Sequence, residues 1–327
     1  MIRSSRLLAE RTLLADAVFV GFPAPARHPY KRLLRQLANP DGSAGSGSLH
    51  VSRWAEGLDP VVPTTPVETE VRVRAEGFVY EPPGTGEVHW HVNFADADVF
   101  GFHAGALFAQ DEMQIAEHPI LASVRDWMLD EHFPALTEED GRATPILVSG
   151  AERRLSVDTA PRPGAPHGLY GHRFAAAPWA VVREATTVLQ PPTVSNIAAM
   201  AAPQGGYGRY SRDEITHVLA TAVTTFSAAR VVSQHLHGEG VRVVMHSGFW
   251  GCGAFGGNRQ LMPALQMLAA RRAGLDRLDM HSLGVGGPEA MQHAMQVAQE
   301  IGAGDDVRAW IAAAYARGFE WGESDGN

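Results

Sequence analysis

Two adjacent acids, Asp111 and Glu112, follow a glycine-interrupted polar segment at residues 93–109. Adjacent acids at the edge of a loop can divide the work of cleaving a glycosidic bond, because one orients a ribose hydroxyl while the other transfers a proton. The pattern makes Glu112 a candidate acid/base and Asp111 its partner. The alternative is a plain helix N-terminus, where the macrodipole favours acids without any catalytic role.

A second candidate site is the glycine-rich segment GFWGCGAFGG, residues 248–257, which lies between a strand pattern and a helical pattern. Glycines let backbone N–H groups approach a phosphate, and the N-terminus of the following helix adds partial positive charge. The segment therefore suits a phosphate cradle. A tight strand-to-helix turn would also require glycine, and the segment matches neither the Walker pattern nor the Rossmann fingerprint.

Two histidines are candidate metal ligands, and the single cysteine is a candidate reactive thiol. His89 and His91 lie two apart in a strand pattern and so share one face, as metal-binding pairs often do. His103 and His118 are nearby, but no carboxylate or third histidine has a recognisable metal-site spacing, so we predict no metal and no cofactor. Cys252 is the only cysteine, which excludes an intrachain disulfide. It is either an activated thiol or a small residue that fits the turn, and the turn is favoured.

Strand and helix patterns alternate through the chain and would position these candidates. The alternation predicts an α/β fold with a mixed, largely parallel sheet covered on both faces. Ser211 and Glu214 form a capping box before the longest helical pattern. Strand patterns occupy residues 67–80, 88–94, 144–151, 191–203, 241–247 and 275–284, and helical patterns occupy residues 109–131, 211–238, 258–274 and 288–304.

The N-terminal part of the chain has a different pattern. Apolar positions at helical spacing within residues 2–38, broken by prolines, predict two short helices. Residues 39–48 are rich in glycine and serine and predict a loop or linker. We therefore expect a helical extension and linker at residues 1–65 and one larger domain at residues 66–327.

Charge and hydropathy narrow the set of partners. The formal net charge of -9 and the pI near 5.9 argue against non-specific binding to nucleic acid or an anionic membrane. Charged residues interrupt the apolar N-terminus before it could serve as a signal-peptide core, and we expect no stretch able to span a bilayer. A cytoplasmic protein is expected. The near absence of lysine among the basic residues suggests a GC-rich bacterial source.

Together, the two candidate segments resemble the signature segments of the poly(ADP-ribose) glycohydrolase family. VNFAD at residues 92–96 resembles the family's Asp-Phe-Ala-Asn strand end, and Gln110, Asp111 and Glu112 stand where the family has Gln-Glu-Glu. WGCGAFGG at residues 250–257 is similar to the family's motif almost residue for residue. The segments ILVSGAERRLS and GLYGHRF resemble two further family segments in the right order, and the similarity covers roughly residues 67–300.

The resemblance implies a macrodomain fold, three-layer α/β/α, that holds ADP-ribose between two loops and hydrolyses a ribosyl bond without metal. Glu112 would then be the acid/base and Asp111 its partner on the ribose. The other residues that the resemblance places at the ligand are Asn93, Gln110, Tyr170, Gly251, Cys252, Gly253, Ala254, Phe255 and Gly256.

The chain also departs from the family pattern at three places. Phe100, Gly101 and Phe102 stand where the family has three glycines, so a ligand would meet bulky rings there. Asp111 replaces the first glutamate and has a shorter reach. Leu283 stands about where the family has a phenylalanine that stacks on adenine. These changes favour a ligand of altered shape over a long polymer.

Three functions therefore remain open from the sequence. The first is a hydrolase that cleaves a ribosyl bond in an ADP-ribose conjugate or a related NAD-derived nucleotide, with Glu112 as acid/base. The second is a non-catalytic ADP-ribose-binding module. The third is an enzyme of specialised metabolism that acts on a small nucleotide-derived intermediate. The expected partners are an ADP-ribose-like nucleotide or an ADP-ribosylated substrate.

Overall fold

The computed structural model describes residues 5–45, 47–56, 68–284, 286–304 and 306–326. Its main sheet is formed by β1 (Ser5–Leu14), β2 (Ser48–Glu56), β3 (Glu70–Arg74), β4 (Glu87–Ala95), β7 (Ile146–Val157), β8 (Thr186–Ala201), β9 (Arg242–Gly248) and β10 (Arg277–His281). A small separate hairpin pairs β5 (Glu138–Glu139) with β6 (Arg142–Ala143).

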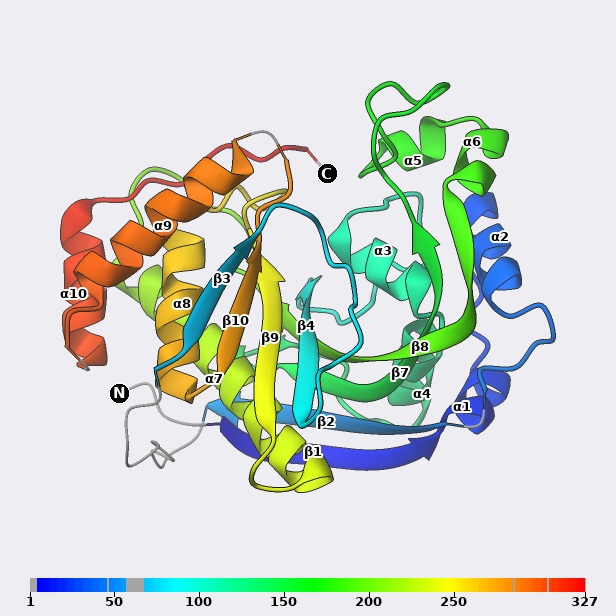
Figure 1. Cartoon of the computed structure of the whole chain (residues 1–327), viewed down its shortest axis with the longest axis horizontal. Coiled ribbons are helices and arrows are strands. Elements are labelled where there is room, and N and C mark those ends of the chain that lie inside the picture. The colour runs from blue at the N-terminus through cyan, green and yellow to red at the C-terminus, as the bar shows by residue number, and fades with distance from the viewer. Residues whose placement is uncertain (1–4, 46, 57–67, 285, 305, 327) are drawn as a thin grey trace.

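The main sheet is eight-stranded and mixed, in the order β1-β2-β7-β8-β4-β9-β10-β3. The strands from β8 to β3 in this order run parallel to one another, whereas β1, β2 and β7 are antiparallel to their neighbours. Helices cover both faces of the sheet (Figure 1). The predicted three-layer architecture with a mixed sheet is therefore confirmed.

The four helices predicted between residues 109 and 304 are present, one of them divided. The stretch predicted at residues 109–131 is broken at His118 and Pro119, because proline cannot continue a helix from the preceding turn. The helices are α1 (Ala15–Gly21), α2 (Pro29–Ala38), α3 (Gln110–Glu117), α4 (Ile120–Asp130), α5 (Arg173–Ala176), α6 (Trp179–Glu184), α7 (Arg212–His237), α8 (Leu261–Ala273), α9 (Gly287–Ile301) and α10 (Val307–Arg317). Of these, α5, α6 and α10 were not predicted.

The N-terminal segment joins the sheet. Of the two predicted short helices, the second is present as α2. The first was wrong, because Leu7 to Leu14 belong to strand β1 and α1 begins only at Ala15. β2 pairs with β7, so this segment extends the sheet at its antiparallel edge. The predicted domain boundary at residues 65–66 lies outside the described residues.

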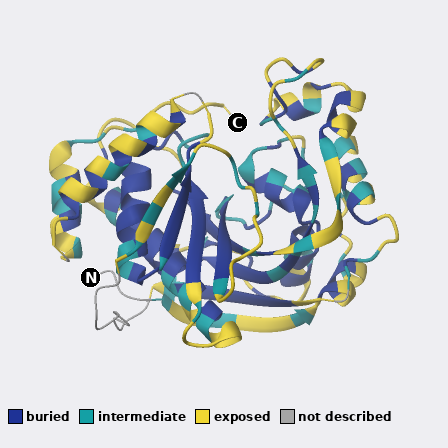
Figure 2. Ribbon diagram, viewed as in Figure 1, coloured by how far each residue is buried: buried dark blue, intermediate teal, exposed yellow. Residues whose placement is uncertain are grey.

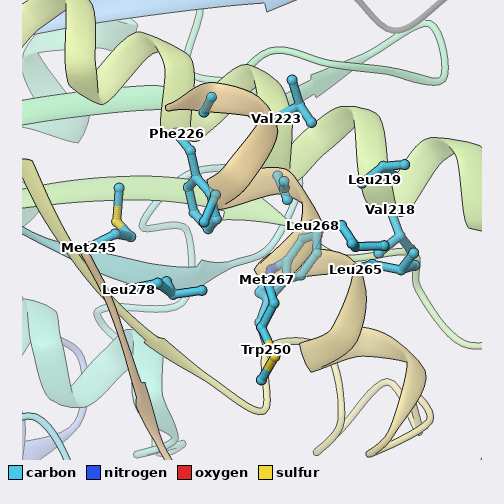
Figure 3. Packing of buried hydrophobic residues seen from close by; sticks show 14 of the residues in the cluster. Val218, Leu219, Val223, Phe226, Met245, Trp250, Leu265, Met267, Leu268 and Leu278 are labelled. Atoms are coloured by element: carbon cyan, nitrogen blue, oxygen red, sulfur yellow. The ribbon is translucent and has the colours of Figure 1, made fainter. Parts of the chain in front are cut away.

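The largest hydrophobic core lies on one face of the sheet, beneath α7, α8 and α9. Phe226 of α7, Leu265 of α8 and Met245 of β9 are fully buried in this core, and Figure 3 shows them packed together. Replacing a ring such as Phe226 by alanine in such a core costs about 3–5 kcal/mol. This face is therefore the rigid support for the strand ends that carry the candidate site.

Helix α7 begins with the predicted capping box, in which the Glu214 N–H donates to Ser211 Oγ. Contrary to our expectation that no stretch could span a bilayer, α7 is the one helix of the described residues with the length and apolar composition for it. However, 67% of that window is buried inside the protein. The sheet on which the helix packs has buried central strands (Figure 2). The apolar character of α7 is therefore explained by its packing on the sheet.

The opposite face of the sheet differs from one half to the other. Over β2, β7 and β8, helices α1 and α4 enclose a second apolar core. Because successive side chains of a strand point to opposite faces, His89 and His91 of β4 lie on this face, as do His246 of β9 and His281 of β10. There the sheet carries histidines and is covered by residues of the β3–β4 connection.

Candidate active site

The first turn of α3 carries Asp111 and Glu112, and both are buried, at 6% and 2% exposure. Asn93 of β4 donates from its side-chain amide to Asp111 Oδ1 at 2.8 Å. The Ala109 N–H donates to Glu112 Oε2 at 2.9 Å. Glu112 thus caps its own helix, which agrees with the alternative that these acids simply mark a helix N-terminus. Both carboxyls are buried, however, whereas acids at a helix N-terminus ordinarily lie at the surface.

Gln110 fastens the start of α3 to the end of β4. Its side-chain oxygen accepts from the Phe94 N–H at 2.7 Å, and its amide nitrogen donates to Val92 O at 3.1 Å. The hydroxyl of Tyr170 is hydrogen-bonded to the backbone of Gln110. Residues 93, 110 and 170, which we predicted at the ligand, therefore surround the acid pair.

Burial changes the proton balance of the acid pair. Burial, followed by the charge of Glu112, raises the pKa of Asp111 to about 8, and burial also raises the pKa of Glu112. Because the two carboxyls are adjacent, their protons leave in steps that belong to the pair. At neutral pH the pair keeps a proton and can act as a general acid.

The glycine-rich segment forms a tight turn between β9 and α8. Gly251 and Gly256 have φ values of 74° and 63°, a region that favours glycine, and a Cβ on Gly257 would lie 2.7 Å from Gly251 O. The turn alone thus explains these three glycines. At Gly253 the nearest atoms to an added Cβ all belong to the Asp325 carboxyl group, at 3.2 Å and beyond, and Ala254 is exposed.

Cys252 and Phe255 support the turn. Burial raises the pKa of Cys252 to about 12, and its thiol donates to Trp250 O and Asn258 O at 3.6 and 3.7 Å. Such a thiol is not activated, which favours the small-residue explanation. Phe255 packs partly buried against the main core.

The acid pair and the glycine-rich turn lie at the same edge of the sheet. β4 and β9 are parallel neighbours, so the segments that follow their carboxyl ends emerge side by side. The Phe94 ring lies 3.7 Å from where a Cβ of Gly248 would stand. Tyr170 links the acid pair to the glycine-rich turn. Burial is the main cause that raises the pKa of its hydroxyl to about 12, and the charges of Asp325 and Glu112 raise it further.

The C-terminal segment, residues 319–325, crosses the glycine-rich turn and was not singled out from the sequence. The Gly322 N–H donates to Gly256 O at 2.8 Å, and the Asp325 N–H donates to Gly253 O at 3.4 Å. The Trp321 ring stacks on Tyr210 at 4.2 Å between centroids. Figure 1 shows this segment passing over the upper ends of β10 and β9.

Phe100, which was predicted among the ligand-binding residues, has a buried side chain. Its side chain is fully buried in the second apolar core, and its φ of 56° turns the chain so that the ring points inward. A ligand could meet only its backbone. Phe102, by contrast, is 53% exposed, Gly101 packs against Asp98, and Leu283 is 61% exposed. The two large rings of this loop therefore differ, because Phe100 belongs to the core and Phe102 to the surface.

The histidine pair proves to be part of a buried row, here called the histidine row: His89, His246 and His281. The ring nitrogens of His246 lie 3.1 Å from His89 and 3.0 Å from His281. At the ends, His89 faces the Glu87 carboxylate at 3.2 Å and His281 donates to Glu76 O at 3.0 Å. In the part of the chain that the structure describes, no group of three or more potential ligands could hold a metal ion.

The hydrogen bonds of the histidine row fix its proton count. Glu76 O and the Glu87 carboxylate only accept, so each end needs an N–H, and each of the two inner links needs one more. Three neutral imidazoles carry one N–H fewer than the row requires. Burial lowers the pKa of His246 to about 2 and also lowers that of His281, so neither ring readily takes up a further proton.

His91 lies next to the row without joining it. Its ring stacks on His246 at 4.5 Å and on Tyr80 at 4.2 Å, and neither of its ring nitrogens has a hydrogen-bond partner. Phe78 meets His281 edge-on at 4.9 Å. Residues 76–80 therefore form the cover of the row. His246 and His281 were missed from the sequence because they stand in separate strands far along the chain.

Comparisons with known proteins agree with this fold. Residues 175–285 match the family model described as poly(ADP-ribose) glycohydrolase, macro domain fold. A search of curated proteins gave no match. The matched region runs from α5 to beyond β10 and contains the glycine-rich turn.

Solved structures with a similar fold include poly(ADP-ribose) glycohydrolases from two organisms. That from Thermomonospora curvata is 15% identical, with a TM-score of 0.45 over 88% of this chain and 84% of that chain. Its complex with the inhibitor ADP-HPD is 16% identical, with a TM-score of 0.46 over 70% and 79%. That from Deinococcus radiodurans, in complex with ADP-ribose, is 13% identical, with a TM-score of 0.41 over 70% and 85%.

The fold of this chain is that of the macro domain, and residues 175–285 are similar to the poly(ADP-ribose) glycohydrolase family. The resemblance predicted from the sequence is thereby confirmed. The roles of the individual site residues stay predictions.

Proposed function

We propose that the protein is a glycoside hydrolase of the poly(ADP-ribose) glycohydrolase type, which cleaves a ribosyl bond in an ADP-ribose conjugate. The observation that carries this proposal is the buried acid pair on α3, which keeps a proton at neutral pH. The family match over residues 175–285 supports the substrate class. The backbone at Gly253 and Ala254 would receive the diphosphate.

Glu112 is the acid/base in this proposal. Its carboxyl gives a proton to the leaving oxygen as the bond to the ribose breaks, and its carboxylate then takes a proton from the water that attacks the ribose. Asp111 is held by Asn93 at 2.8 Å and orients a ribose hydroxyl. Water is the only co-reactant.

A second function, a non-catalytic ADP-ribose-binding module, is favoured by one observation. Glu112 Oε2 accepts from the Ala109 N–H at 2.9 Å, so this residue has a structural reason to be present without catalysis. In that case the acid pair would shape the pocket and would not transfer protons.

The substitution Glu112→Gln separates the two functions, because glutamine can still accept the Ala109 N–H bond. We expect native protein to release ADP-ribose from poly(ADP-ribose) or from a mono-ADP-ribosylated protein. Glu112→Gln should lose at least about a hundredfold in turnover, the usual contribution of a general acid. ADP-ribose binding measured by calorimetry should be retained.

The control is Glu131→Gln, which removes an exposed carboxylate at the end of α4 and should leave turnover unchanged. Native protein that binds ADP-ribose but releases none from either substrate would establish the binding module in place of the hydrolase. Turnover that survives Glu112→Gln would remove Glu112 from its assigned role. Failure to bind ADP-ribose would overturn both functions.

A further inference from the structure

The only lysine of the chain, Lys31, lies behind the acid pair. It belongs to α2 and is 4% exposed. Its Nζ donates to His103 O at 3.4 Å and lies 5.4 Å from the centroid of the Phe108 ring. His103 and Phe108 both belong to the segment that leads directly into α3. Lys31 is therefore bound to the chain that positions Asp111.

The contact between this segment and the N-terminal part of the chain is extensive. The N–H groups of Arg27 and His28, just before α2, both donate to Ala104 O at 3.0 Å. Lys31 and His103 also line a cavity of about 30 Å³ together with Ile115 of α3. The ammonium thus lies in the interior, between α2 and the back of α3.

A buried ammonium is costly unless negative charge compensates it. The carbonyl at 3.4 Å is a weak partner, so the compensating charge must come from the acids. Burial lowers the pKa of Lys31 to about 8, and the charges of Glu112 and then Asp111 oppose that change. In return, Lys31 lowers the raised pKa values of both carboxyls.

The other titratable groups around this cluster do not replace Lys31. Burial lowers the pKa values of His28 and His103, so both are neutral where Lys31 is charged. Asp96 faces the acid pair and raises the pKa of each carboxyl further. The charged and titratable groups that face the cluster from the packed elements are His28, Arg32, Asp96, His103, Arg125, Asp126 and Tyr170.

We propose that Lys31 is a positioning residue of the active site, whose buried ammonium is bound to the segment that leads into α3 and stabilises the carboxylate charge formed when Glu112 gives up its proton. This role rests on the hydrolysis proposed above. Without the ammonium, both buried carboxyls would hold their protons more strongly, which disfavours the carboxylate that orients the ribose or activates water. The segment before β2 therefore completes the site.

Because Lys31 is the only lysine, its ammonium can be titrated alone by NMR of protein labelled with ¹³C,¹⁵N-lysine. The native signal should titrate near pH 8, and in Glu112→Gln the midpoint should fall by about one pH unit, since a compensating charge is lost. An unchanged midpoint in Glu112→Gln would overturn the proposal. This measurement needs no turnover, so it decides the coupling even if the proposed hydrolysis fails.

The pH profile of kcat/KM tests the catalytic consequence. In Lys31→Met the pKa values of the pair rise, so both limbs of the profile should move up by about one pH unit, and Lys31→Arg should restore the native profile. The matched control is Arg35→Met, one turn further along α2. Arg35 bonds to Pro119 O and Ser123 Oγ of the α4 region, and Asp126 is the charge that acts on it.

Arg35→Met should lower the stability of the protein, as any weakening of α2 packing would. It should leave the pH profile of kcat/KM at its native position. A Lys31→Met profile at the native position, reduced only in height, would reduce Lys31 to a packing residue and overturn its positioning role. If native protein shows no turnover on any ADP-ribosylated substrate, the hydrolase proposal fails, and the NMR titration alone decides whether Lys31 and the acids are coupled.

Discussion

Two buried polar clusters occupy the same face of the sheet and solve the problem of buried charge in different ways. The acid pair on α3 holds carboxyls with raised pKa values and receives its counter-charge from Lys31 of another element. The histidine row instead consists of rings that contact one another and end at Glu87 and Glu76 O. The acid pair can therefore release a proton near neutral pH, whereas burial keeps His246 and His281 from taking one up.

The two clusters also respond to pH with opposite sign. A carboxyl with a raised pKa stabilises the fold at low pH and loses that contribution as the pH rises through its folded value. A histidine with a lowered pKa contributes above its ordinary value of 6.5 and loses that contribution as the pH falls. Lowering the pH should therefore reduce the contribution of the histidine row to stability and increase that of the acid pair.

The largest effect is expected at Arg153, which contacts α3 on one side and the cover of the histidine row on the other. Its guanidinium pairs with the buried Glu117 of α3 at 2.8 Å and lies over the Tyr80 ring, which stacks on His91. Arg153→Met leaves Glu117 buried without a positive charge beside it, although the Val157 N–H still donates to it. The substitution should lower the free energy of unfolding by about 3–5 kcal/mol in urea denaturation. The neighbouring pair of Arg154 is more exposed, so Arg154→Met should cost about 1 kcal/mol. Equal losses in the two variants would contradict the importance of the buried pair.

The next effect tests the histidine row. His246→Phe removes both inner hydrogen bonds and should cost about 2 kcal/mol at neutral pH, because two buried ring nitrogens lose their partner. The same change removes a group that must gain a proton on unfolding in acid, so stability should fall less steeply below pH 6.5. The difference in slope is about 1.4 kcal/mol per pH unit, measured by thermal unfolding between pH 6 and 4. An identical slope would show that the row does not resist protonation.

The acid pair should show the reverse trend. In Asp111→Asn the Asn93 bond can be kept, but the buried carboxyl that ionises near pH 8 is gone. Relative to native protein, this variant should gain stability as the pH rises from 5 to 8, by up to about 1.4 kcal/mol per pH unit. Unfolding midpoints that run parallel over this range would place the titrating group elsewhere.

The smallest effect concerns Asp325, whose side chain lies beside Gly253 and whose charge reaches Tyr170. Asp325→Asn removes a negative charge from the place proposed for the diphosphate. ADP-ribose affinity should rise about threefold at low salt and return toward the native value at high salt, as an exposed charge is screened. A gain that does not depend on salt would indicate a steric effect instead.

Local patterns predicted much of the fold but not its long-range pairings. The sequence predicted β4, β9 and α7, because the periodicity and capping residues of these elements can be recognised within a short stretch of chain. The strand β1 was mistaken for helix because its leucines also fit a helical spacing, and only pairing with β2 decides between the two. Propensity could not reveal that the N-terminal segment belongs to the sheet.

The candidate site was likewise predicted where it depends on local motifs and missed where it depends on long-range packing. Asp111, Glu112 and the turn at residues 250–257 were found from motifs, whereas the inward turn of Phe100 depends on a backbone φ of 56° that the sequence does not display. The partnership of Lys31 with the acids depends on the packing of α2 against α3. Its status as the only lysine was the one available signal. The distances that make these groups a site exist only in the folded chain.

The path of residues 319–325 has a practical consequence for labelled or fused versions of the protein. A reporter joined after Asp325 would stand beside Gly253 and could obstruct the entry of a bulky substrate. One attached on the side of β1 would instead leave from the outer edge of the sheet, separated from the site by β2, β7 and β8. Immobilisation through the β1 side is therefore the arrangement that keeps the mouth of the site clear.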